Sequence, residues 1–468
     1  MSVDSLLDAE AATIAEAVRS RAVSAVAVAE AALARIAAHN PALNAFTDVT
    51  ADRAFAEARA VDETLARGED PGPLAGVPFA VKNLFDIRGL PTRAGSRIGR
   101  ESPPAARDAT AIRRLRAAGA VLLGGLNMGE YAYDFTGENA HDGPSRNPHD
   151  PSRMAGGSSG GSGAAVAARL VPLALGSDTN GSIRVPAAFC GIFGLKPTFG
   201  RLSRAGTVPF VASLDHIGPL ARSVRDLAAA YDAMQGWDAD DPACRRKAAE
   251  PVTDRLPLGA QGLRIARLGA AFHEGATAEA IAAVEACAEA LGVTRTIDLP
   301  EIARARAAAQ IITAAEAGVL HLDRLRTRAL DYDPATRDRF LAGALVPAAW
   351  LIAAQRFRRW FFERVMETFR AVDVLLAPAT PFAAPPLGVG GTIRLGGREI
   401  PLRAAIGLFT APFSFVGLPV VCAPVGRSAE GLPLGVQIVA APWREEHALR
   451  VAAALEALGV ARCPAPPG

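Results

Sequence analysis

The chain has 468 residues, of which 50% are hydrophobic and 21% are charged, a composition typical of a globular protein and not of a disordered or fibrous one. Its 50 Lys and Arg nearly balance its 48 Asp and Glu, and they form no basic stripe that could neutralise phosphates, so we expect no nucleic-acid partner. At this length the chain can form one large layered domain or two domains.

The cysteines and the amino terminus indicate the compartment. The five cysteines are widely spaced and include no Cys-x-x-Cys pair, which disfavours both a disulfide framework and a zinc site; they are Cys190, Cys244, Cys287, Cys422 and Cys463. The first ten residues lack the basic start and apolar core of an export signal. We therefore expect reduced thiols, no metal and a cytoplasmic location.

Helical and strand-like segments alternate through the first half of the chain. Residues 5–39 have helical spacing and predict two amphipathic helices that stop before Asn40-Pro41. Short apolar runs then predict strands near residues 45–49, 77–81, 120–124 and 171–175, separated by helical segments such as 51–67 and 109–118. This alternation predicts an α/β fold, with a large mixed β-sheet covered by helices on both faces.

The middle of the chain, about residues 238–370, has a different composition. Arg-rich and Ala-rich helical patterns dominate it, and aromatic residues at helical spacing predict a packed cluster in the core; they are Trp350, Phe357, Trp360, Phe361 and Phe362. We expect residues 1–468 to form a single domain in which this helix-rich region is variable. After it, strands near 372–377 and 435–439 and a helix over about 445–458 complete the pattern.

The uncharged stretch 404–426 is long enough to span a bilayer. Pro412, Pro419 and Pro424 divide it into short pieces, and residues 419–423 read as an interior strand. We therefore predict a buried sheet here and no membrane association.

Lysine is rare in this chain. Of its 50 Lys and Arg residues, only Lys82, Lys196 and Lys247 are lysine. Lys82 follows the apolar run 77–81, which predicts burial, and a buried Lys can lose its proton whereas Arg cannot. We predict that Lys82 is a base and that Lys196 is structural.

Two hydroxyl-rich loops follow Lys82 and supply candidate nucleophiles. Ser158 and Ser159 lie among the glycines of residues 156–161, which permit an unusual backbone and a close approach. In the second loop, residues 177–182, Ser182 leads into a short helical segment, so the N–H groups of Thr179, Asn180 and Gly181 can converge on an oxyanion. We expect Asp178 and Arg184 to brace this turn as an ion pair.

A serine hydroxyl needs a neighbouring base before it can attack a carbonyl. His141, His149 and His216 are near in sequence, but none lies in a Gly-x-Ser-x-Gly motif. A Ser-Lys arrangement is the recognised alternative. An ordinary Lys pKa of about 10.4 leaves roughly one amine in 2,500 neutral at pH 7, a handicap of about 4 to 5 kcal/mol, so burial has to lower the pKa of Lys82.

These motifs resemble the amidase signature family. The matching segments are 81–83, 155–162 and 176–184, with further likeness at 194–198 and 417–419. The resemblance implies that Ser182 attacks the carbonyl, that Ser158 follows a cis peptide bond and relays the proton, and that neutral Lys82 is the base. It also implies that Ser159 hydrogen-bonds Lys82 and that the enzyme uses no cofactor.

One departure from the common family sequence indicates which members of the family the chain resembles most. This chain has Asn180-Gly181 where Gly-Gly is common, and with segments 130–135 and 199–206 it looks most like the large subunits of 1-carboxybiuret hydrolases. That likeness implies ammonia release from a small carboxylated amide. It also implies a small helical partner related to the amidotransferase C subunit, in a dimer or heterotetramer. Candidate substrate-binding residues are Tyr131, Tyr133, Asn180 and Arg204.

Three alternatives remain open. The chain could be the glutamine-hydrolysing subunit of a tRNA-dependent amidotransferase, which shares the same relay and which Asn180 disfavours, or a broad-specificity aliphatic amidase. It could also be a catalytically silent scaffold, against which the intact set of Lys82, Ser158 and Ser182 argues.

Overall fold

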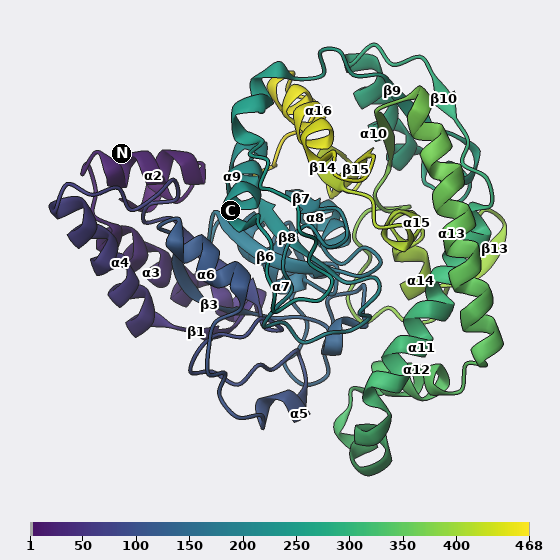
Figure 1. The fold of residues 1–468 in the computed structure, drawn as a ribbon, viewed down its shortest axis with the longest axis horizontal. Coiled ribbons are helices and arrows are strands. Elements are labelled where there is room, and N and C mark those ends of the chain that lie inside the picture. The colour runs from purple at the N-terminus through teal and green to yellow at the C-terminus, as the bar shows by residue number, and fades with distance from the viewer. Residues whose placement is uncertain (1–2, 468) are drawn as a thin grey trace.

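The centre of the computed structural model, which describes residues 3–467, is one eleven-stranded mixed sheet (Figure 1). In order across the sheet the strands are β1 (Phe46–Val49), β3 (Val121–Leu126), β2 (Pro78–Lys82), β6 (Leu173–Asp178), β8 (His216–Ala221), β7 (Phe193–Lys196), β14 (Val420–Arg427), β15 (Pro433–Ala440), β11 (Val374–Pro378), β9 (Ile265–Leu268) and β10 (Thr296–Ile297). β3, β2 and β6 are parallel, as are β11, β9 and β10, and the strands between these groups are antiparallel. The predicted mixed α/β sheet is confirmed.

Sixteen helices and two small hairpins surround this sheet in the described part of the chain. The hairpins are β4 (Arg146–Asn147) with β5 (Asp150–Met154), and β12 (Thr392–Leu395) with β13 (Arg398–Pro401). The α-helices are α1 (Val3–Leu6), α2 (Ala11–Arg19), α3 (Ala25–Leu43), α4 (Ala51–Ala66), α5 (Arg97–Arg100), α6 (Thr110–Ala117), α7 (Gly160–Ala167), α8 (Arg184–Cys190), α9 (Val224–Met234), α10 (Ala278–Ala290), α11 (Ile302–Arg328), α12 (Pro334–Ala344), α13 (Ala348–Ala371), α14 (Leu402–Ile406), α15 (Ala411–Phe415) and α16 (Glu445–Ala457).

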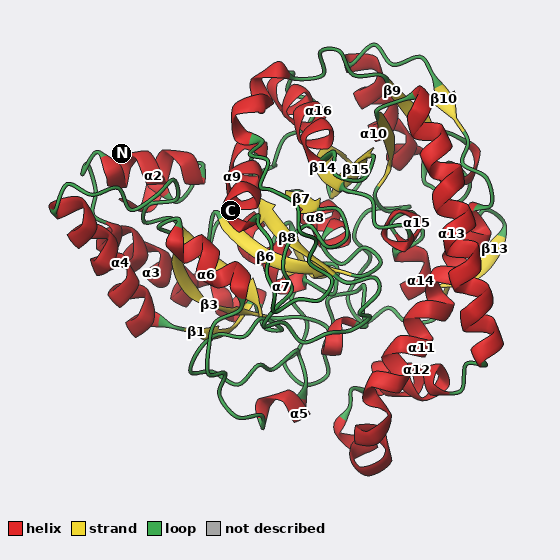
Figure 2. Ribbon diagram, viewed as in Figure 1, coloured by secondary structure: helices red, strands yellow, loops and turns green. Residues whose placement is uncertain are grey.

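Helices cover both faces of the sheet (Figure 2). α7 and α8 contact each other and the central strands, and α9 and α16 contact each other and the central strands from the other side. α11, α12 and α13 form a separate group at one end of the molecule, in the green part of the ribbon in Figure 1. Small residues let α7 lie unusually close to its neighbours, because a Cβ on Gly161 would be only 2.4 Å from the carbonyl oxygen of Ala45.

The parallel pairing of β2 with β6 positions Lys82 beside the second hydroxyl-rich loop. Val81 is in register with Leu175, so the strands end side by side at the same edge of the sheet. Lys82 is the last residue of β2, and Ser177 and Asp178 are the last two of β6. Because the carboxyl ends of adjacent parallel strands are where open α/β sheets place their sites, the register alone brings the lysine to the second loop.

The predicted helix stop before Asn40-Pro41 is wrong, because α3 continues to Leu43 with Pro41 inside it. Proline there removes a single backbone donor within the last turn, which the helix tolerates better than a break in its middle. The side chain of Asn40 ends the helix instead, since its Oδ1 accepts the backbone N–H groups of Ala45 at 2.9 Å and Phe46 at 2.7 Å.

The aromatic residues of α13 do not form the core cluster that their spacing predicts. Phe361 is buried and stacks on Phe357, but the side chains of Trp350, Trp360 and Phe362 are 59%, 39% and 36% exposed. The helix turns one face to α11 and the opposite face to solvent, and aromatic residues occupy both. Periodicity could not distinguish these faces because the aromatic residues extend around the helix.

The uncharged stretch 404–426 contains part of strand β14, as predicted for an interior strand. Residues Val420 to Val425 are buried and pair with β15 on one side and β7 on the other. No single helix among residues 3–467 is long and apolar enough to cross a membrane, although α12 and α13, which meet at an angle of 94°, pass that test as a bent pair.

A buried ion pair joins the second loop to the opposite half of the sheet. Arg184 donates to both carboxylate oxygens of Asp178, at 2.9 and 3.0 Å, and neither side chain is exposed. Arg184 also donates to Gln437 on β15 at 2.7 Å and to Ser414 on α15 at 2.6 Å. Burial would raise the pKa of Asp178, but the charge and hydrogen bonds of Arg184 outweigh it and hold the pKa below its ordinary value.

We expect Arg184→Met to lower the free energy of unfolding by about 3 to 5 kcal/mol, since it leaves the Asp178 carboxylate buried without its counter-ion, with only the hydrogen bonds from Ile183 and Ser414. Urea denaturation followed by circular dichroism measures this. Arg359→Met is the matched control, because the side chain of Arg359 is 86% exposed and pairs only with Glu363 one turn away. Equal denaturation midpoints for the two variants would contradict the prediction.

Candidate active site

Lys82 lies at the bottom of the site and contacts two serine hydroxyls. Its Nζ is 2.6 Å from Oγ of Ser158 and 2.8 Å from Oγ of Ser177. The side chain is fully buried. The first and second loops therefore meet at one amine. The contact between Lys82 and Ser158 agrees with the sequence pattern. The contact with Ser177 is one that the sequence did not predict.

Burial lowers the pKa of Lys82 to about 7, because solvent no longer stabilises the ammonium, and the negative charges of Asp178, Asp215 and Asp134 only partly oppose this effect. At such a pKa about half of the amine is neutral near pH 7, against roughly one part in 2,500 for an ordinary lysine. The amine can therefore accept a proton from a hydroxyl at hydrogen-bond distance.

The two serine loops run side by side. The backbone N–H of Ser159 donates to the carbonyl oxygen of Ser182 at 3.3 Å, and the peptide bond between Gly157 and Ser158 is cis, as the resemblance implies. Ser158 is fully buried, and Ser182 is 3% exposed and lines a cavity. The chain thus places Ser158 between the loop of Ser182 and the amine of Lys82.

The structure corrects the expected role of Ser159. Its hydroxyl donates to the carbonyl oxygen of Ser177 at 3.2 Å and accepts the N–H of the same residue at 3.3 Å. Within the described residues its hydroxyl makes no hydrogen bond to Lys82, whose second partner is Ser177. The reason is the strand end of β6, which places the Ser177 hydroxyl nearer to Nζ, so Ser159 holds Ser177 and not the lysine directly.

The second loop presents free backbone donors. Among the hydrogen bonds of residues 3–467, none uses the backbone N–H of Thr179, Asn180 or Gly181 as its donor. Gly181 has a φ of +150°, and a Cβ on it would meet Oγ1 of Thr410 at 2.2 Å. Thr410 in turn donates to the carbonyl oxygen of Asn180 at 2.6 Å, which fixes the loop with its N–H groups unpaired. Such donors suit a developing oxyanion.

A small cavity lies over Ser182, and the space in it and at its mouth, open solvent included, is about 270 Å³. It is lined by Ala132, Tyr133, Asp134, Phe135, Thr179, Asn180, Ser182, Phe210, Gln310, Thr313 and Arg339. Of the predicted substrate-binding residues, Tyr133 and Asn180 are therefore at the site. Tyr131 is not among these lining residues, because it packs behind them against His321, with ring centroids 4.3 Å apart.

Arg204 lies outside this cavity, which corrects its predicted contact with substrate. Its guanidinium pairs with the carboxylate of Asp241 at 3.3 Å and donates to the carbonyl oxygen of Ala212 at 2.7 Å. These partners occupy the side chain on a neighbouring surface. A single motif could not reveal this, because Asp241 is separated from Arg204 by 37 positions.

Arg339 is a cationic side chain in the wall of this cavity, and the sequence analysis did not identify it. It lies on α12, and its guanidinium covers the ring of Tyr133 at 3.5 Å and donates to the carbonyl oxygen of the same residue at 2.6 Å. No ion pair with Arg339 occurs within residues 3–467, and the nearby acid Asp134 pairs with Arg403 instead. Burial lowers the pKa of Arg339. Its position in the variable region, without any motif, left no signal in the sequence.

The start of α12, which carries Arg339, is fixed by the fully buried Glu130. One carboxylate oxygen of Glu130 accepts the N–H of Asp333 at 2.8 Å and the hydroxyl of Thr336 at 2.5 Å, and the other is 3.0 Å from Nε2 of His141. The Asp333 side chain accepts the N–H of Ala140 at 3.0 Å. The segment 139–141 and Glu130 therefore tie the start of the helix to the loop between β3 and β4.

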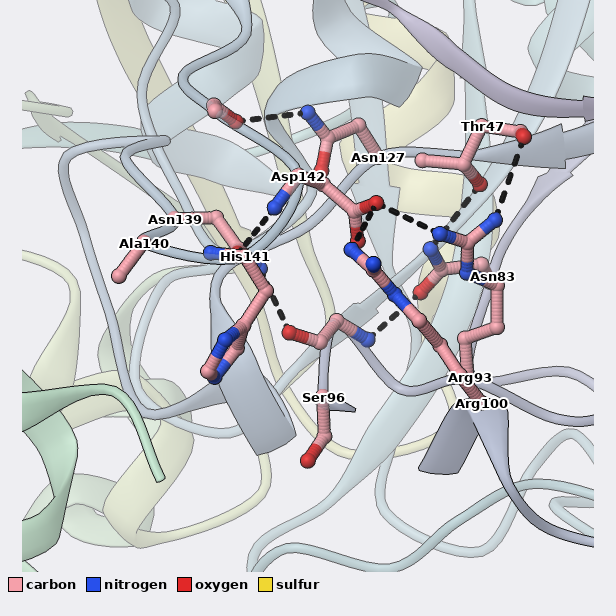
Figure 3. A network of polar contacts seen from close by, with 12 residues as sticks. Thr47, Asn83, Arg93, Ser96, Arg100, Asn127, Asn139, Ala140, His141 and Asp142 are labelled. Atoms are coloured by element: carbon pink, nitrogen blue, oxygen red, sulfur yellow. Dashed lines mark hydrogen bonds and ion pairs between the residues drawn. The ribbon is translucent and has the colours of Figure 1, made fainter. Parts of the chain in front are cut away.

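That segment belongs to a wider polar network that also reaches the residue after Lys82 (Figure 3). Asp142 is paired with Arg93 at 2.6 Å and Arg100 at 2.5 Å. Asn83 donates to the Thr47 hydroxyl at 3.1 Å, and its Oδ1 accepts the N–H of Gly95 at 2.9 Å. Because these contacts cross from β2 to the loops beside it, they fix the end of the strand that carries Lys82.

The remaining candidate residues have structural partners. Lys196 is buried, and its Nζ contacts the carbonyl oxygen of Leu418 and lies 3.3 Å from Nε2 of His216. Burial, together with the charge of Arg184, lowers the pKa of Lys196 well below its ordinary value. His216 and Lys196 do not line the cavity over Ser182, in keeping with the structural role predicted for Lys196.

Comparison with known proteins places this site in a family. The model of the family described as Amidase matches residues 27–449. The chain therefore belongs to the amidase signature family, and it is an amidase, a hydrolase that acts on C–N bonds.

Its similarity to particular members extends over almost the whole chain. It is 55% identical over 450 residues to AtzE, a 1-carboxybiuret hydrolase subunit of Pseudomonas sp. (strain ADP), and the match covers 96% of this chain and 98% of that protein. A solved structure described as an unexpected vestigial protein complex that reveals the evolutionary origins of an s-triazine catabolic enzyme has a TM-score of 0.96 and 54% identity, and covers 97% of this chain and 100% of its own.

A more distant relative is the A subunit of glutamyl-tRNA(Gln) amidotransferase from Anaeromyxobacter sp. (strain K). It is 41% identical over 484 residues, which cover 96% of each protein. The hydrolase subunit is thus markedly more similar to this chain than the amidotransferase subunit is.

We expect the rate at which a fluorophosphonate labels the protein to depend on the ionisation of Lys82. Only the neutral amine can take the proton of the serine relay, so the rate should rise about tenfold per pH unit up to about pH 7 and level off above it. Labelling followed by gel fluorescence between pH 5 and 9 measures this. A rate that stays flat across that range would contradict a titrating base near neutrality.

Proposed function

We propose that the protein hydrolyses a small carboxylated amide of the 1-carboxybiuret type and releases ammonia through an acyl-Ser182 intermediate. The observation that carries this proposal is the arrangement around one cavity of Ser182, a buried lysine relay and an unpaired arginine, Arg339. The likeness to the carboxybiuret hydrolase subunit supports the same substrate class.

Acylation begins when Ser182 Oγ attacks the carbonyl carbon. Its proton passes to Ser158 as the Ser158 proton passes to Nζ of Lys82, whose pKa of about 7 matches that task. The resulting oxyanion lies against the N–H groups of Thr179, Asn180 and Gly181. The tetrahedral intermediate then collapses, and the proton returns from Lys82 through Ser158 to the departing ammonia.

Deacylation uses the same groups with water in place of the amine. Neutral Lys82 takes a proton from water through Ser158, hydroxide adds to the acyl carbon, and Ser182 leaves with the proton that the relay returns. The acid product and the free serine complete the cycle. Every proton remains among Lys82, the two serines, substrate and water.

Arg339 is the proposed partner of the substrate carboxylate. It combines a permanent charge, a place on the cavity wall and the absence of a protein anion paired with it in the described residues. A planar guanidinium binds a carboxylate with two hydrogen bonds. Glu130 and its bonds to α12 hold this cation at the site.

The proposed assembly follows the relatives. We propose a small helical partner related to the amidotransferase C subunit, in a dimer or heterotetramer, and a cytoplasmic location. The similar solved structure is described as a protein complex, which supports a partner for this chain. Hydrolysis of glutamine for a tRNA-dependent amidotransferase is the second candidate function, supported by the 41% identity to the amidotransferase relative. Ammonia release from carboxybiuret, malonamate and glutamine, assayed side by side, separates the two.

Substitution of the relay should abolish turnover. We expect Ser182→Ala to release no ammonia and Lys82→Arg to fail as well, by at least about 10³-fold in kcat, since arginine keeps the charge but cannot accept the proton. The coupled ammonia assay measures both. Lys247→Arg is the control, because Lys247 is on the surface, paired with Glu250 at 2.8 Å. Retained activity in Lys82→Arg would contradict proton transfer by this residue.

Substitution of Arg339 should act on substrate binding more than on the chemical step. We expect Arg339→Met to raise KM for the carboxylated amide by about 10²-fold, because a charge-assisted hydrogen bond is lost, with a smaller effect on labelling of Ser182 by an uncharged fluorophosphonate. Arg337→Met, two positions away on the same helix and paired with Asp338 at the surface, is the matched control. An unchanged KM in Arg339→Met would exclude this carboxylate site.

A further inference from the structure

Asn180 carries an unused hydrogen-bond acceptor in the wall of the active-site cavity. The residue is 4% exposed, and its Oδ1 is buried without a hydrogen-bond partner among residues 3–467. A buried carbonyl oxygen that lacks a donor costs roughly 1 to 3 kcal/mol, and such groups are rare in folded proteins. Because Asn180 lines the cavity two residues before Ser182, a bound substrate is the natural source of the missing donor.

The orientation of the side-chain amide is fixed by its other end. Nδ2 of Asn180 donates to Oγ1 of Thr313 on α11 at 2.8 Å, and Thr313 lines the same cavity. The backbone is fixed as well, since the carbonyl oxygen of Asn180 accepts the hydroxyl of Thr410 at 2.6 Å. One N–H of the amide is bonded to Thr313, and the oxygen is the atom of this side chain that lacks a partner among residues 3–467, so the group left over for a ligand is an acceptor.

The location of this acceptor indicates which part of the substrate it meets. Lys82, which in the proposed mechanism returns the proton to the leaving ammonia, is the last residue of β2, and its partner Ser158 lies in the loop before α7. Asn180 is anchored instead to α11, and α11 packs against α12, which carries Arg339. The acceptor and the cation thus belong to the same helical wall. If Arg339 binds the carboxylate, as proposed above, the acyl part of the substrate lies along that wall, away from the leaving amine.

We propose that Oδ1 of Asn180 accepts a hydrogen bond from an N–H group that flanks the scissile carbonyl on its acyl side. This inference rests on the proposed function and specifies it further. The site then selects ureido carboxylates, in which the carbonyl lies between two nitrogens, over carboxylated amides with a methylene at that position. A pocket that offers a hydrogen-bond acceptor discriminates strongly against an analogue that lacks the donor, because the buried acceptor is left unpaired.

Two substrates that differ at one atom test this selection. Allophanate and malonamate are both small carboxylated primary amides, and they differ only in having N–H or CH₂ between the carbonyl and the carboxylate. The measured quantity is the ratio of kcat/KM for allophanate to kcat/KM for malonamate, from ammonia release. This ratio is independent of how much of a variant is correctly folded.

We expect the wild type to prefer allophanate and Asn180→Ala to lower the ratio by about 10-fold or more, the effect of losing one hydrogen bond to a buried group. Thr313→Val, which frees the amide to rotate, should lower the ratio in the same direction, while Thr313→Ser should preserve it. Asn180 itself is kept in both Thr313 variants, so they test the acceptor without deleting it.

The possible outcomes separate the inference from the function on which it rests. Equal losses on both substrates in Asn180→Ala, with an unchanged ratio, would overturn the N–H contact and leave the amidase proposal standing. Ammonia release from neither substrate by the wild type would overturn the proposed substrate class and the inference with it. A ratio that falls in Asn180→Ala and Thr313→Val but not in Thr313→Ser supports the contact.

Discussion

The burial of one amine is the constraint on which the rest of the site depends. Lys82 can act as a base only if its ammonium loses the stabilisation that water gives it, and full burial lowers its pKa to about 7. An amine in the interior needs polar neighbours, and the hydroxyls of Ser158 and Ser177 supply them. The contact with Ser177 requires that β2 and β6 run parallel and end at the same edge, and the contact with Ser158 requires the loop before α7. The sheet topology and this loop together set the surroundings, and so the pKa, of the lysine.

The ion pair of Asp178 with Arg184 performs the complementary task for the oxyanion loop. It joins the last residue of β6 to the first residue of α8 and ties the turn to β15 and α15 through Gln437 and Ser414. A rigid turn is necessary because the N–H groups of Thr179, Asn180 and Gly181 have to remain unpaired in the resting protein. Donors that keep this arrangement before substrate arrives need no reorganisation during the reaction. The chemical half of the site is therefore built from the sheet and fixed by buried charge.

The recognition half of the site comes from a different part of the fold. Arg339 and Thr313 belong to helices of the region that composition marks as distinct, and Glu130 holds the start of α12 next to the serine loops. In the proposed reaction, one half supplies the proton relay and the other supplies a cation and an amide acceptor for the substrate. Asn180 joins the two, since its backbone belongs to the oxyanion loop and its side chain reaches α11.

Sequence by itself determined the chemistry and the class of fold. Lys82, Ser158 and Ser182 could be selected because the reaction needs those residue types in glycine-rich or strand-end settings, and such requirements leave local patterns. Seven of the eleven strands in the main sheet followed from periodicity for the same reason. The end of α3 was predicted wrongly because the hydrogen bonds of the Asn40 side chain, and not the position of Pro41, decide where that helix ends.

Only the tertiary structure decided which side chains contact one another and which reach the cavity. Arg204 pairs with Asp241, Ser177 displaces Ser159 as the second neighbour of the lysine, and Arg339 arrives at the cavity from more than 150 positions after Ser182. The short strands β7, β8, β9 and β10 likewise depend on pairing that no local pattern records. A local pattern reports what a residue can do, whereas its pKa, its hydrogen bonds and its access to substrate are set by groups distant in the chain that folding brings within a few ångströms.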